Sequence, residues 1–326
     1  MNDEHDSPPP NVTAELLPFA EAVIKGLSGK RKSLPSKFIY NEEGWSLFKQ
    51  ILQQPEYYTG RAEKEILALH RDAIAALVDG ASVDLVDLGA GDGEKTRIII
   101  DDWLQRGFSF RYVPVDLNES AINTLLNKLR GSLPQLSIEP HVTDYKLGVP
   151  RNRAAESGAR LVMFLGASIG NFKQQELRAF MANLRGSLEP GDKVFTGFDL
   201  KKDPQRLIRA YDDAAGVTAR FNFNLLKRIN AEFGADFKLE DFEYYTTYNA
   251  IAGAVESSIV SRVEQRVRIE ALNMTVEFDA WEAIHTETAR KFTERQIEAM
   301  AREYGFTVGG RFYDKEKNIV DYVWEV

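Results

Sequence analysis

The stretch Val83–Thr96, VDLVDLGAGDGEKT, decides the fold of this chain. An apolar-rich run over Val83–Leu88 ends in the glycine-rich segment Gly89–Gly93, and the helix-like segment Lys95–Leu104 follows. Glycines at such a position let the backbone turn sharply and approach a ligand without a Cβ in the way. The stretch therefore predicts a buried strand, a ligand-binding turn and the start of a helix.

Strands and helices alternate along the chain after this stretch. Further strands are expected over short apolar runs: Phe110–Val115, Leu136–Val142, Leu161–Leu165 and Lys193–Leu200. One helix is expected after the second strand, ending at Leu129, and another over Gln174–Leu188. The last three predicted elements are a helix and two strands: Thr293–Tyr304, Phe306–Tyr313 and Ile319–Trp324. Strands that alternate with helices at this spacing are typical of an open parallel α/β sheet.

Two other parts of the chain lack this alternation. Residues 12–58 and Ala62–Leu77 show the helical spacing of apolar residues, interrupted by the ordered connection Lys32–Gly44. Pro204–Phe233 predicts one long helix. Phe242–Ile284 supplies β-rich segments with no helix between them, which is typical of an antiparallel insertion.

We therefore expect an α/β protein with two domains. The sheet domain is expected over residues 61–200 and 291–326. A second, α+β domain is expected from the N-terminal helices and the insertion, over residues 12–60 and 201–290. Residues 1–11 are polar and rich in proline and contain no apolar run, so we interpret them as a disordered lead-in and not as a signal peptide.

The composition of the 326 residues excludes several classes of function. Lys and Arg number 41 against 49 Asp and Glu, and a net charge of −8 makes nucleic acid a poor partner. The absence of cysteine removes disulfides, thiolate zinc sites and cysteine nucleophiles. The four histidines, His5, His70, His141 and His285, have no metal-ligand spacing, so no metal site is expected. No apolar run approaches about 18 residues, so we expect no membrane span and a cytoplasmic protein.

The glycine turn fits a dinucleotide poorly. A dinucleotide site needs G-x-G-x-x-G, and Glu94 stands at its last position here. Pyrophosphate at that helix N-terminus would also meet Asp92 and Glu94 as like charges. Asp116, which ends the second strand, is suited to two ribose hydroxyls, and Asp144, after the third, to an adenine amino group. S-adenosylmethionine (SAM) has an adenosine, a cationic centre and no phosphate, and it is the cofactor that the pattern predicts.

A second motif points to a hydrolase instead. Gly166–Gly170 matches G-x-S-x-G directly after an apolar strand, the setting of a nucleophile elbow. With Ser168 as nucleophile, Asp199 and His285 would complete the chain order of an α/β hydrolase. Against this reading, the first strand already carries a cofactor-type turn, and no HGGG-like oxyanion segment is present. A further alternative is a protein that binds the cofactor without catalysis, because fold does not fix function.

Several long motifs follow one another from Lys32 to the C-terminus: KSLPSKFIY (32–40), QPEYYTGRAE (54–63), DLGAGDGEKT (87–96), FLGASIGN (164–171), RAYDDAAGVTARFN (209–222) and TETARKF (286–292). In these motifs the chain resembles the histidine-specific, SAM-dependent N-methyltransferases of ergothioneine biosynthesis, which convert L-histidine to its Nα-trimethyl betaine, hercynine. The resemblance implies a Rossmann-like class I methyltransferase sheet with a second α+β substrate domain. It also implies a small-molecule amino acid as the partner, and a monomer is the expected state.

The resemblance implies roles for matching positions. The cofactor would be bound by six residues: Gly89, Gly91, Lys95, Asp116, Asp144 and Tyr145. Tyr57, Asn171 and Tyr211 resemble the residues that hold the carboxylate and the α-amino group of the substrate. Tyr40 and Glu287 resemble the pair that reads the imidazole ring. Asn171 and Tyr40 are the expected catalytic residues.

Two positions depart from the family pattern at the side-chain end of the substrate site. Ala289 stands where the family usually has a serine that contributes to imidazole recognition. Ser257 stands where the best-known members have a methionine, whereas Glu287 is retained. A related branch of the family methylates the α-amino group of tryptophan derivatives. Another aromatic amino acid such as tryptophan, or a related amine, is therefore the alternative substrate.

Overall fold

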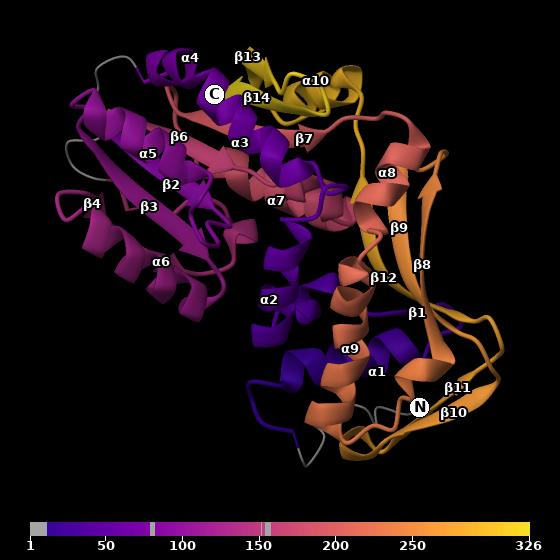
Figure 1. Cartoon of the computed structure of the whole chain (residues 1–326). Helices are drawn as coiled ribbons and strands as arrows, with labels where there is room; N and C mark the ends of the chain where they lie inside the picture. The colour runs from indigo at the N-terminus through magenta and orange to yellow at the C-terminus, as the bar shows by residue number, and fades with distance from the viewer. Residues whose placement is uncertain (1–11, 79–81, 151, 154–157) are drawn as a thin grey trace. The chain divides into compact units, whose positions relative to one another are not determined.

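The computed structural model describes residues 12–78, 82–150, 152–153 and 158–326 (Figure 1). The chain divides into two compact units. Unit 1 contains the residues up to Tyr57 and Lys202–Arg290, and unit 2 contains Tyr58–Lys201 and Lys291–Val326. The expected disordered lead-in over residues 1–11, with His5, lies outside the described residues. That one unit serves the cofactor and the other the substrate stays a prediction.

Unit 2 contains an eight-stranded mixed sheet in the order β13-β14-β7-β6-β2-β3-β4, with β5 also paired to β3. Its strands are β2 (Val83–Leu88), β3 (Phe110–Asp116), β4 (Ser137–Ile138), β5 (His141–Val142), β6 (Ala159–Phe164), β7 (Lys193–Asp199), β13 (Thr307–Tyr313) and β14 (Ile319–Glu325). The strands β2 to β7 pair in parallel, whereas β14 pairs antiparallel with both β7 and β13. The predicted α/β sheet is confirmed.

The strand order of this sheet reverses between β2 and β6. From β2 the chain proceeds outward to β3 and β4, and from β6 it proceeds in the opposite direction to β7. In open α/β sheets, ligands bind beyond the carboxyl ends of the strands at such a switch point. The segments that follow β2, β3 and β6 are therefore where a ligand is expected.

Helices flank the strands of unit 2: α3 (Thr59–Leu69), α4 (Arg71–Ala76), α5 (Thr96–Gln105), α6 (Glu119–Ser132), α7 (Gln174–Gly186), α10 (Glu294–Glu303) and the short 3-10 helices η2 (Tyr145–Leu147) and η3 (Ser168–Asn171). Phe180 and Met181 of α7 share one buried core with Ile297 and Ala301 of α10 and with apolar side chains of the central strands. These helices thus pack against the central strands of the sheet.

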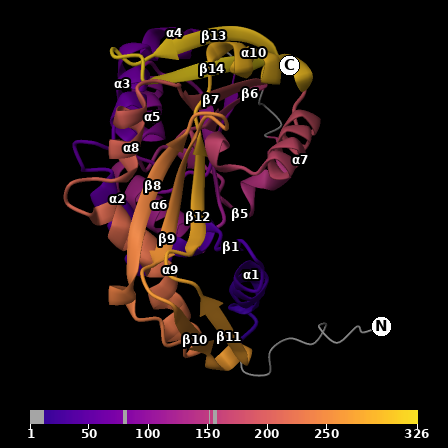
Figure 2. The same cartoon turned by 90° about the vertical axis from the view of Figure 1, so that its right-hand side faces the viewer.

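Unit 1 combines helices with a four-stranded sheet in the order β1-β12-β9-β8 and a separate hairpin β10-β11. Its elements are α1 (Leu17–Leu27), β1 (Lys32–Ser33), η1 (Ser36–Ile39), α2 (Glu42–Ile51), α8 (Pro204–Tyr211), α9 (Val217–Phe233), η4 (Leu239–Asp241), β8 (Phe242–Asn249), β9 (Ala254–Ser261), β10 (Gln265–Ile269), η5 (Glu270–Leu272), β11 (Met274–Phe278) and β12 (Ala283–Arg290). Figure 2 shows β8, β9 and β12 side by side, and the pairs β8–β9 and β9–β12 are antiparallel, as the insertion predicts.

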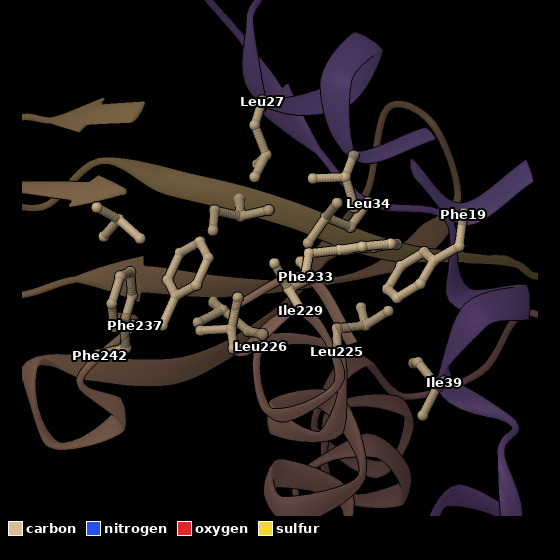
Figure 3. Close-up of a cluster of buried hydrophobic side chains, with 14 of the residues drawn as sticks. Phe19, Leu27, Leu34, Ile39, Leu225, Leu226, Ile229, Phe233, Phe237 and Phe242 are labelled. Carbon is tan, nitrogen blue, oxygen red and sulfur yellow. The ribbon is translucent and has the colours of Figure 1, made fainter. Parts of the chain in front are cut away.

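The core of unit 1 is built around α9. Figure 3 shows Leu225, Ile229 and Phe233 of α9 among side chains of the N-terminal segment, including Phe19 of α1 and Ile39 of η1. The rings of Phe19 and Phe233 lie 5.2 Å apart between centroids. Segments that are far apart in the sequence thus share one core.

The single helix predicted over Pro204–Phe233 is wrong. Two helices, α8 and α9, are separated at Asp212–Gly216, because Gly216 takes a left-handed φ of 64°. The Asp213 carboxylate then accepts the backbone N–H groups of Val217 and Thr218 at 2.8 and 2.7 Å. These bonds satisfy donors that a new helix leaves open at its start. The break makes Tyr211 the last residue of α8.

Two further elements are divided where the sequence predicts one. The helix predicted over Ala62–Leu77 breaks at His70, where φ is −109° and ψ is 14°, and the His70 ring lies 3.1 Å from the carbonyl oxygen of Tyr313. The strand predicted over Leu136–Val142 is the two short strands β4 and β5. Pro140 lies between them and has no N–H to donate to the ladder.

Replacing Gly44 in α2 with alanine should destabilise the protein by about 3 kcal/mol or more. A Cβ at this position would overlap the carbonyl oxygen of Ile39 and lie 3.0 Å from Nδ2 of Asn224. That amide cannot withdraw cheaply, because it donates to Ile39 O at 2.8 Å and to Asn41 Oδ1 at 2.7 Å. Urea unfolding of the variant and the wild type measures the difference.

The matched control is Gly131→Ala in α6, where a Cβ would meet nothing within 4 Å. Helix propensity alone should make that variant equal to or up to about 1 kcal/mol more stable than the wild type. Equal stabilities of the two alanine variants would contradict the packing described around Gly44.

Candidate functional site

The glycine turn after β2 has the backbone that the sequence predicts. Gly89, Gly91 and Gly93 have φ angles of 75°, 54° and 67°, the left-handed region that favours glycine. A Cβ on Gly89 would lie 3.7 Å from Cε1 of Tyr145, so the turn passes close to that ring. The N–H of Gly91 donates to Oδ2 of Asp116 at 3.1 Å. The turn after β2 and the end of β3 are therefore joined directly.

Asp116 is fixed by backbone donors on both carboxylate oxygens. Besides Gly91, the N–H of Asn118 donates to its Oδ1 at 2.9 Å. An ionised carboxylate has about four lone-pair sites, so two remain for further donors. The half-buried side chain is thus oriented at the carboxyl edge of the sheet and can accept two hydroxyl groups, as a ribose would supply.

The segment after β5 brings Asp144 and Tyr145 to the same edge. Oδ1 of Asp144 accepts the N–H of Lys146 at 2.9 Å and so caps η2. The Tyr145 ring packs against Phe164 of β6, with centroids 5.6 Å apart. Burial raises the pKa of Tyr145 to about 12, so its hydroxyl stays neutral and can donate. Together with Gly89, these residues form the wall on which an adenine ring could lie.

Lys95 lies between the glycine turn and α5. Its ammonium group pairs with Glu63, a residue that the sequence did not single out. Its Nζ lies 2.8 Å from Oε2 of Glu63, a fully buried side chain of α3, while the Lys95 side chain is 30% exposed. Oε1 of Glu63 accepts the N–H of Gly166 at 2.6 Å. The apolar periodicity of α3 is the one signal that could have revealed Glu63. It places Glu63 on the same face as Ala62, Ile66 and Leu67.

Asn171 ends η3, directly beyond the carboxyl end of β6, and its side chain is exposed. The same segment contains the proposed nucleophile elbow, with Ala167 in the left-handed region at a φ of 51°. Ser168 Oγ donates to Leu165 O at 3.3 Å. Asp199, the carboxylate expected in a hydrolase triad, has other partners. It accepts hydrogen bonds from the hydroxyl of Tyr58 at 2.9 Å and from Nζ of Lys291 at 2.7 Å.

Unit 1 places two of the expected substrate residues together. The rings of Tyr57 and Tyr211 lie edge to face, with centroids 6.2 Å apart and planes at 73°. Tyr40 follows η1 and is half-buried, and its ring contacts those of Trp45, Phe48 and Phe221 at 5.2, 5.5 and 5.2 Å. This aromatic cluster fixes the orientation of the Tyr40 ring.

A β-bulge decides which way Glu287 faces. On β12, His285 pairs with Ser258 of β9, but Glu287 pairs with Ser257, so Thr286 is an extra residue. In a regular strand Glu287 would point to the face opposite Ile284, and the bulge returns it to the same face. Glu287 therefore lies beside Ser257, and the buried Ala289 follows it on that face.

Tyr244 of β8 is a second residue that the sequence did not single out. Its hydroxyl donates to the carbonyl oxygen of Tyr211 at 2.8 Å and lies 2.9 Å from Oγ of Ser257. Burial, reinforced by the negative charge of Glu287, raises the pKa of Tyr244, so the phenol stays neutral. Tyr244, Ser257 and Glu287 therefore form a polar group on one face of the sheet. No signal in the sequence distinguishes Tyr244 from other tyrosines of the β-rich segment.

The predicted residues thus fall into two sets. Unit 2 contains the six cofactor residues and Asn171, and unit 1 contains Tyr40, Tyr57, Tyr211 and Glu287. Among the residues that the structure describes, no group of three or more His, Asp or Glu could hold a metal ion. Within the same residues, every helix is too short or too polar to cross a membrane.

The model of the family described as "Histidine-specific methyltransferase, SAM-dependent" matches residues 19–326. The chain belongs to this family. It is therefore a SAM-dependent histidine N-methyltransferase. Histidine N-alpha-methyltransferases of Mycolicibacterium smegmatis and Mycobacterium tuberculosis are both 38% identical to it, over 87% of this chain and 87% of each relative. The Ergothioneine biosynthesis protein 1 of Schizosaccharomyces pombe is 27% identical over 94% of this chain and 40% of that protein.

Replacing Asp116 with alanine should weaken SAM binding by about 1.5–3 kcal/mol, roughly 10- to 150-fold, because a hydrogen-bonding charged group is lost. Isothermal titration calorimetry with SAM measures the change. Glu119→Ala removes the same charge from the exposed first turn of α6 and should leave the affinity close to that of the wild type. Unchanged affinity in Asp116→Ala would show that the cofactor binds elsewhere.

Proposed function

We propose that this methyltransferase transfers methyl groups from SAM to the α-amino group of L-histidine, up to the trimethylated betaine hercynine. The observation that carries the proposal is the match to the histidine-specific family over residues 19–326. The carboxyl edge of the unit 2 sheet supports it, because it presents two acidic side chains and a lysine around a glycine turn. Because hercynine is formed in ergothioneine biosynthesis, we assign the enzyme to that pathway.

The residues at this edge fit SAM. Asp116 has acceptor capacity for both ribose hydroxyls, and Asp144 is an acceptor for the adenine amino group. The Lys95 ammonium, with one of its three donors on Glu63, can pair with the carboxylate at the amino-acid end of the cofactor. The electrophilic methyl group of its sulfonium is what the bound cofactor supplies.

The remaining chemistry is positioning. Fixing the amine and the methyl group in line at near-attack distance accounts for most of the acceleration in such a displacement. The attacking amine must be neutral, and a free α-amino group has a pKa near about 8, so a positioned acceptor is sufficient. We assign Asn171 the orientation of the amine, and Tyr57 and Tyr211 the grip on the carboxylate. Aromatic faces also suit a growing cation, at roughly 0.5–2 kcal/mol each.

The imidazole ring is assigned to Glu287 and Tyr40. Glu287 can accept a ring N–H, and the hydroxyls of Tyr244 and Ser257 supply further polar groups on its face of the sheet. Ser257 and Ala289 have small side chains, however, which would obstruct a larger aromatic substrate less than bulkier residues would. Methylation of another aromatic amino acid such as tryptophan is therefore the second candidate function.

A substrate competition assay distinguishes these two functions. The purified protein is incubated with SAM and equal concentrations of His, Trp, Tyr and Phe, and the products are followed by mass spectrometry. Methylated histidine as the main product is the expected result. Methylation mainly of tryptophan would keep the reaction and reassign the surface around Glu287, Ser257 and Ala289. We further propose that the enzyme acts in the cytoplasm as a monomer.

A further inference from the structure

Two carboxyl groups lie buried side by side within unit 2. Glu63 comes from α3 and Asp321 from β14, and both side chains are inaccessible to solvent. They meet over Gly197 of β7, the residue paired with Asp321. A Cβ on Gly197 would overlap Oε1 of Glu63 and lie 2.9 Å from Oδ1 of Asp321. The space that a side chain at 197 would fill is therefore occupied by two carboxyl groups.

The two carboxyl groups differ in their partners. Glu63 has the Lys95 ammonium at 2.8 Å and the Gly166 N–H at 2.6 Å, one on each oxygen. Neither oxygen of Asp321 has a hydrogen-bond partner within the described part of the chain. Two adjacent buried carboxylates are not both ionised, and the charge goes to the one with a cation and an N–H donor. Glu63 therefore carries the charge, and Asp321 stays neutral beside it.

The charged oxygens of Glu63 connect two neighbouring segments at the switch point. Lys95 immediately precedes α5, after the turn that follows β2. Gly166 opens the segment that follows β6 and leads to Asn171. Gly166 has a φ of 89°, and a Cβ on it would lie 3.3 Å from Nζ of Lys95. The two segments thus approach closely, and one carboxylate holds a group from each.

We propose that Glu63 is a positioning residue whose carboxylate fixes the Lys95 ammonium and the Gly166 amide, so that Lys95 can bind the carboxylate of the cofactor's amino-acid end. This inference rests on the proposed function. Burial alone would favour loss of the lysine's proton, and Glu63 opposes that loss, with the result that the pKa of Lys95 is raised. Lys95 therefore keeps its charge. Glu63 uses one of the lysine's three N–H donors, and the other two can bind the carboxylate of the cofactor.

Two ligands that differ only at the amino-acid end test the role. S-adenosylhomocysteine has the α-amino and carboxylate groups, whereas 5′-methylthioadenosine has the same adenosine and thioether without them. Glu63→Gln keeps the size of the side chain and an acceptor for Gly166, and removes the charge that holds Lys95. We expect it to weaken S-adenosylhomocysteine by about tenfold or more, and to leave 5′-methylthioadenosine within about twofold, both by calorimetry.

The neighbouring carboxyl group gives the matched control. Asp321→Asn makes the same carboxyl-to-amide change at the neutral group and should leave the affinities for both ligands within about twofold of the wild type. If Glu63 acts through Lys95, the Glu63→Gln change should have no further effect on S-adenosylhomocysteine in a Lys95→Met background.

Equal weakening of both ligands by Glu63→Gln would overturn the proposal, because general damage to the site would explain it. Unchanged or tighter binding of S-adenosylhomocysteine would overturn it as well. A wild-type protein that binds neither SAM nor S-adenosylhomocysteine would instead contradict the proposed function.

Discussion

Replacing Asn171 with alanine should lower kcat for histidine methylation by about a hundredfold or more, while the affinity for S-adenosylhomocysteine stays within about twofold of the wild type. The reason is that Asn171 is assigned the orientation of the amine and not the binding of the cofactor. Its position supports this role, because it lies beyond the carboxyl end of β6 and its side chain is exposed. Single-turnover kinetics and calorimetry measure the two quantities separately.

Ser168→Ala is the control for this variant, because it changes the same 3-10 helix. Ser168 contacts the carbonyl oxygen of Leu165 and has no role in the proposed reaction, so its variant should keep most of the activity. Loss of activity in Ser168→Ala with full activity in Asn171→Ala would remove Asn171 from the mechanism. That pair of results would assign the chemistry to the serine.

Asp321→Asn should stabilise the protein at pH 7 relative to the wild type. Burial raises the pKa of Asp321 well above its ordinary value of 3.8, and the charge of Glu63 raises it further. The folded protein therefore keeps a proton that the unfolded chain releases above pH 3.8. The stability that this proton confers is fully present below pH 3.8 and is lost as the pH rises toward the folded pKa. Asparagine is neutral in both states and removes that loss.

The pH dependence separates this effect from ordinary repacking. The stability gained by Asp321→Asn should be smallest near pH 4 and should grow as the pH rises toward the folded pKa of Asp321. The charged groups that act on Asp321 are Glu63 of α3, Lys95 before α5 and Asp314 before β14. Urea unfolding of both proteins from pH 4 to pH 7 measures the difference. A difference that does not change with pH would show that Asp321 is ionised in the folded protein.

The sequence predicts the sheet of unit 2 well because its signals are local. Strand β2 is buried throughout and four of its six residues are apolar, and the glycines that follow it need left-handed angles that other residues adopt poorly. Asp116 and Asp144 could be selected because Asp116 ends one parallel strand and Asp144 comes shortly after another, and such strands present their carboxyl ends at one edge. The structure joins Gly91 to Asp116 by a hydrogen bond and brings Tyr145 close to Gly89, while the roles of these residues stay predictions.

The failures arise where tertiary contacts override local pattern. The break between α8 and α9 depends on the capping of Val217 and Thr218 by Asp213, although apolar spacing continues across it. The orientation of Glu287 depends on a bulge that a period of two residues does not reveal. The place of Tyr244 in the polar group depends on its hydrogen bonds to Tyr211 and Ser257, which are tertiary contacts.

Glu63 illustrates a different limit of sequence analysis. A glutamate on an amphipathic helix usually lies in solvent, and only its place on the apolar face of α3 indicates otherwise. Its partners, Lys95 and Gly166, come from two distant segments, so the role of the residue depends on the assembled sheet.

The identity of the methylated product is the decisive test of the proposed reaction. The enzyme is incubated with excess SAM and L-histidine until the reaction stops, and the product is analysed by tandem mass spectrometry and proton NMR. We expect three methyl groups, all on the α-nitrogen, with the imidazole ring unmodified. Methyl groups on the imidazole nitrogens, or a histidine that is recovered unchanged while the enzyme is shown to bind SAM, would contradict it.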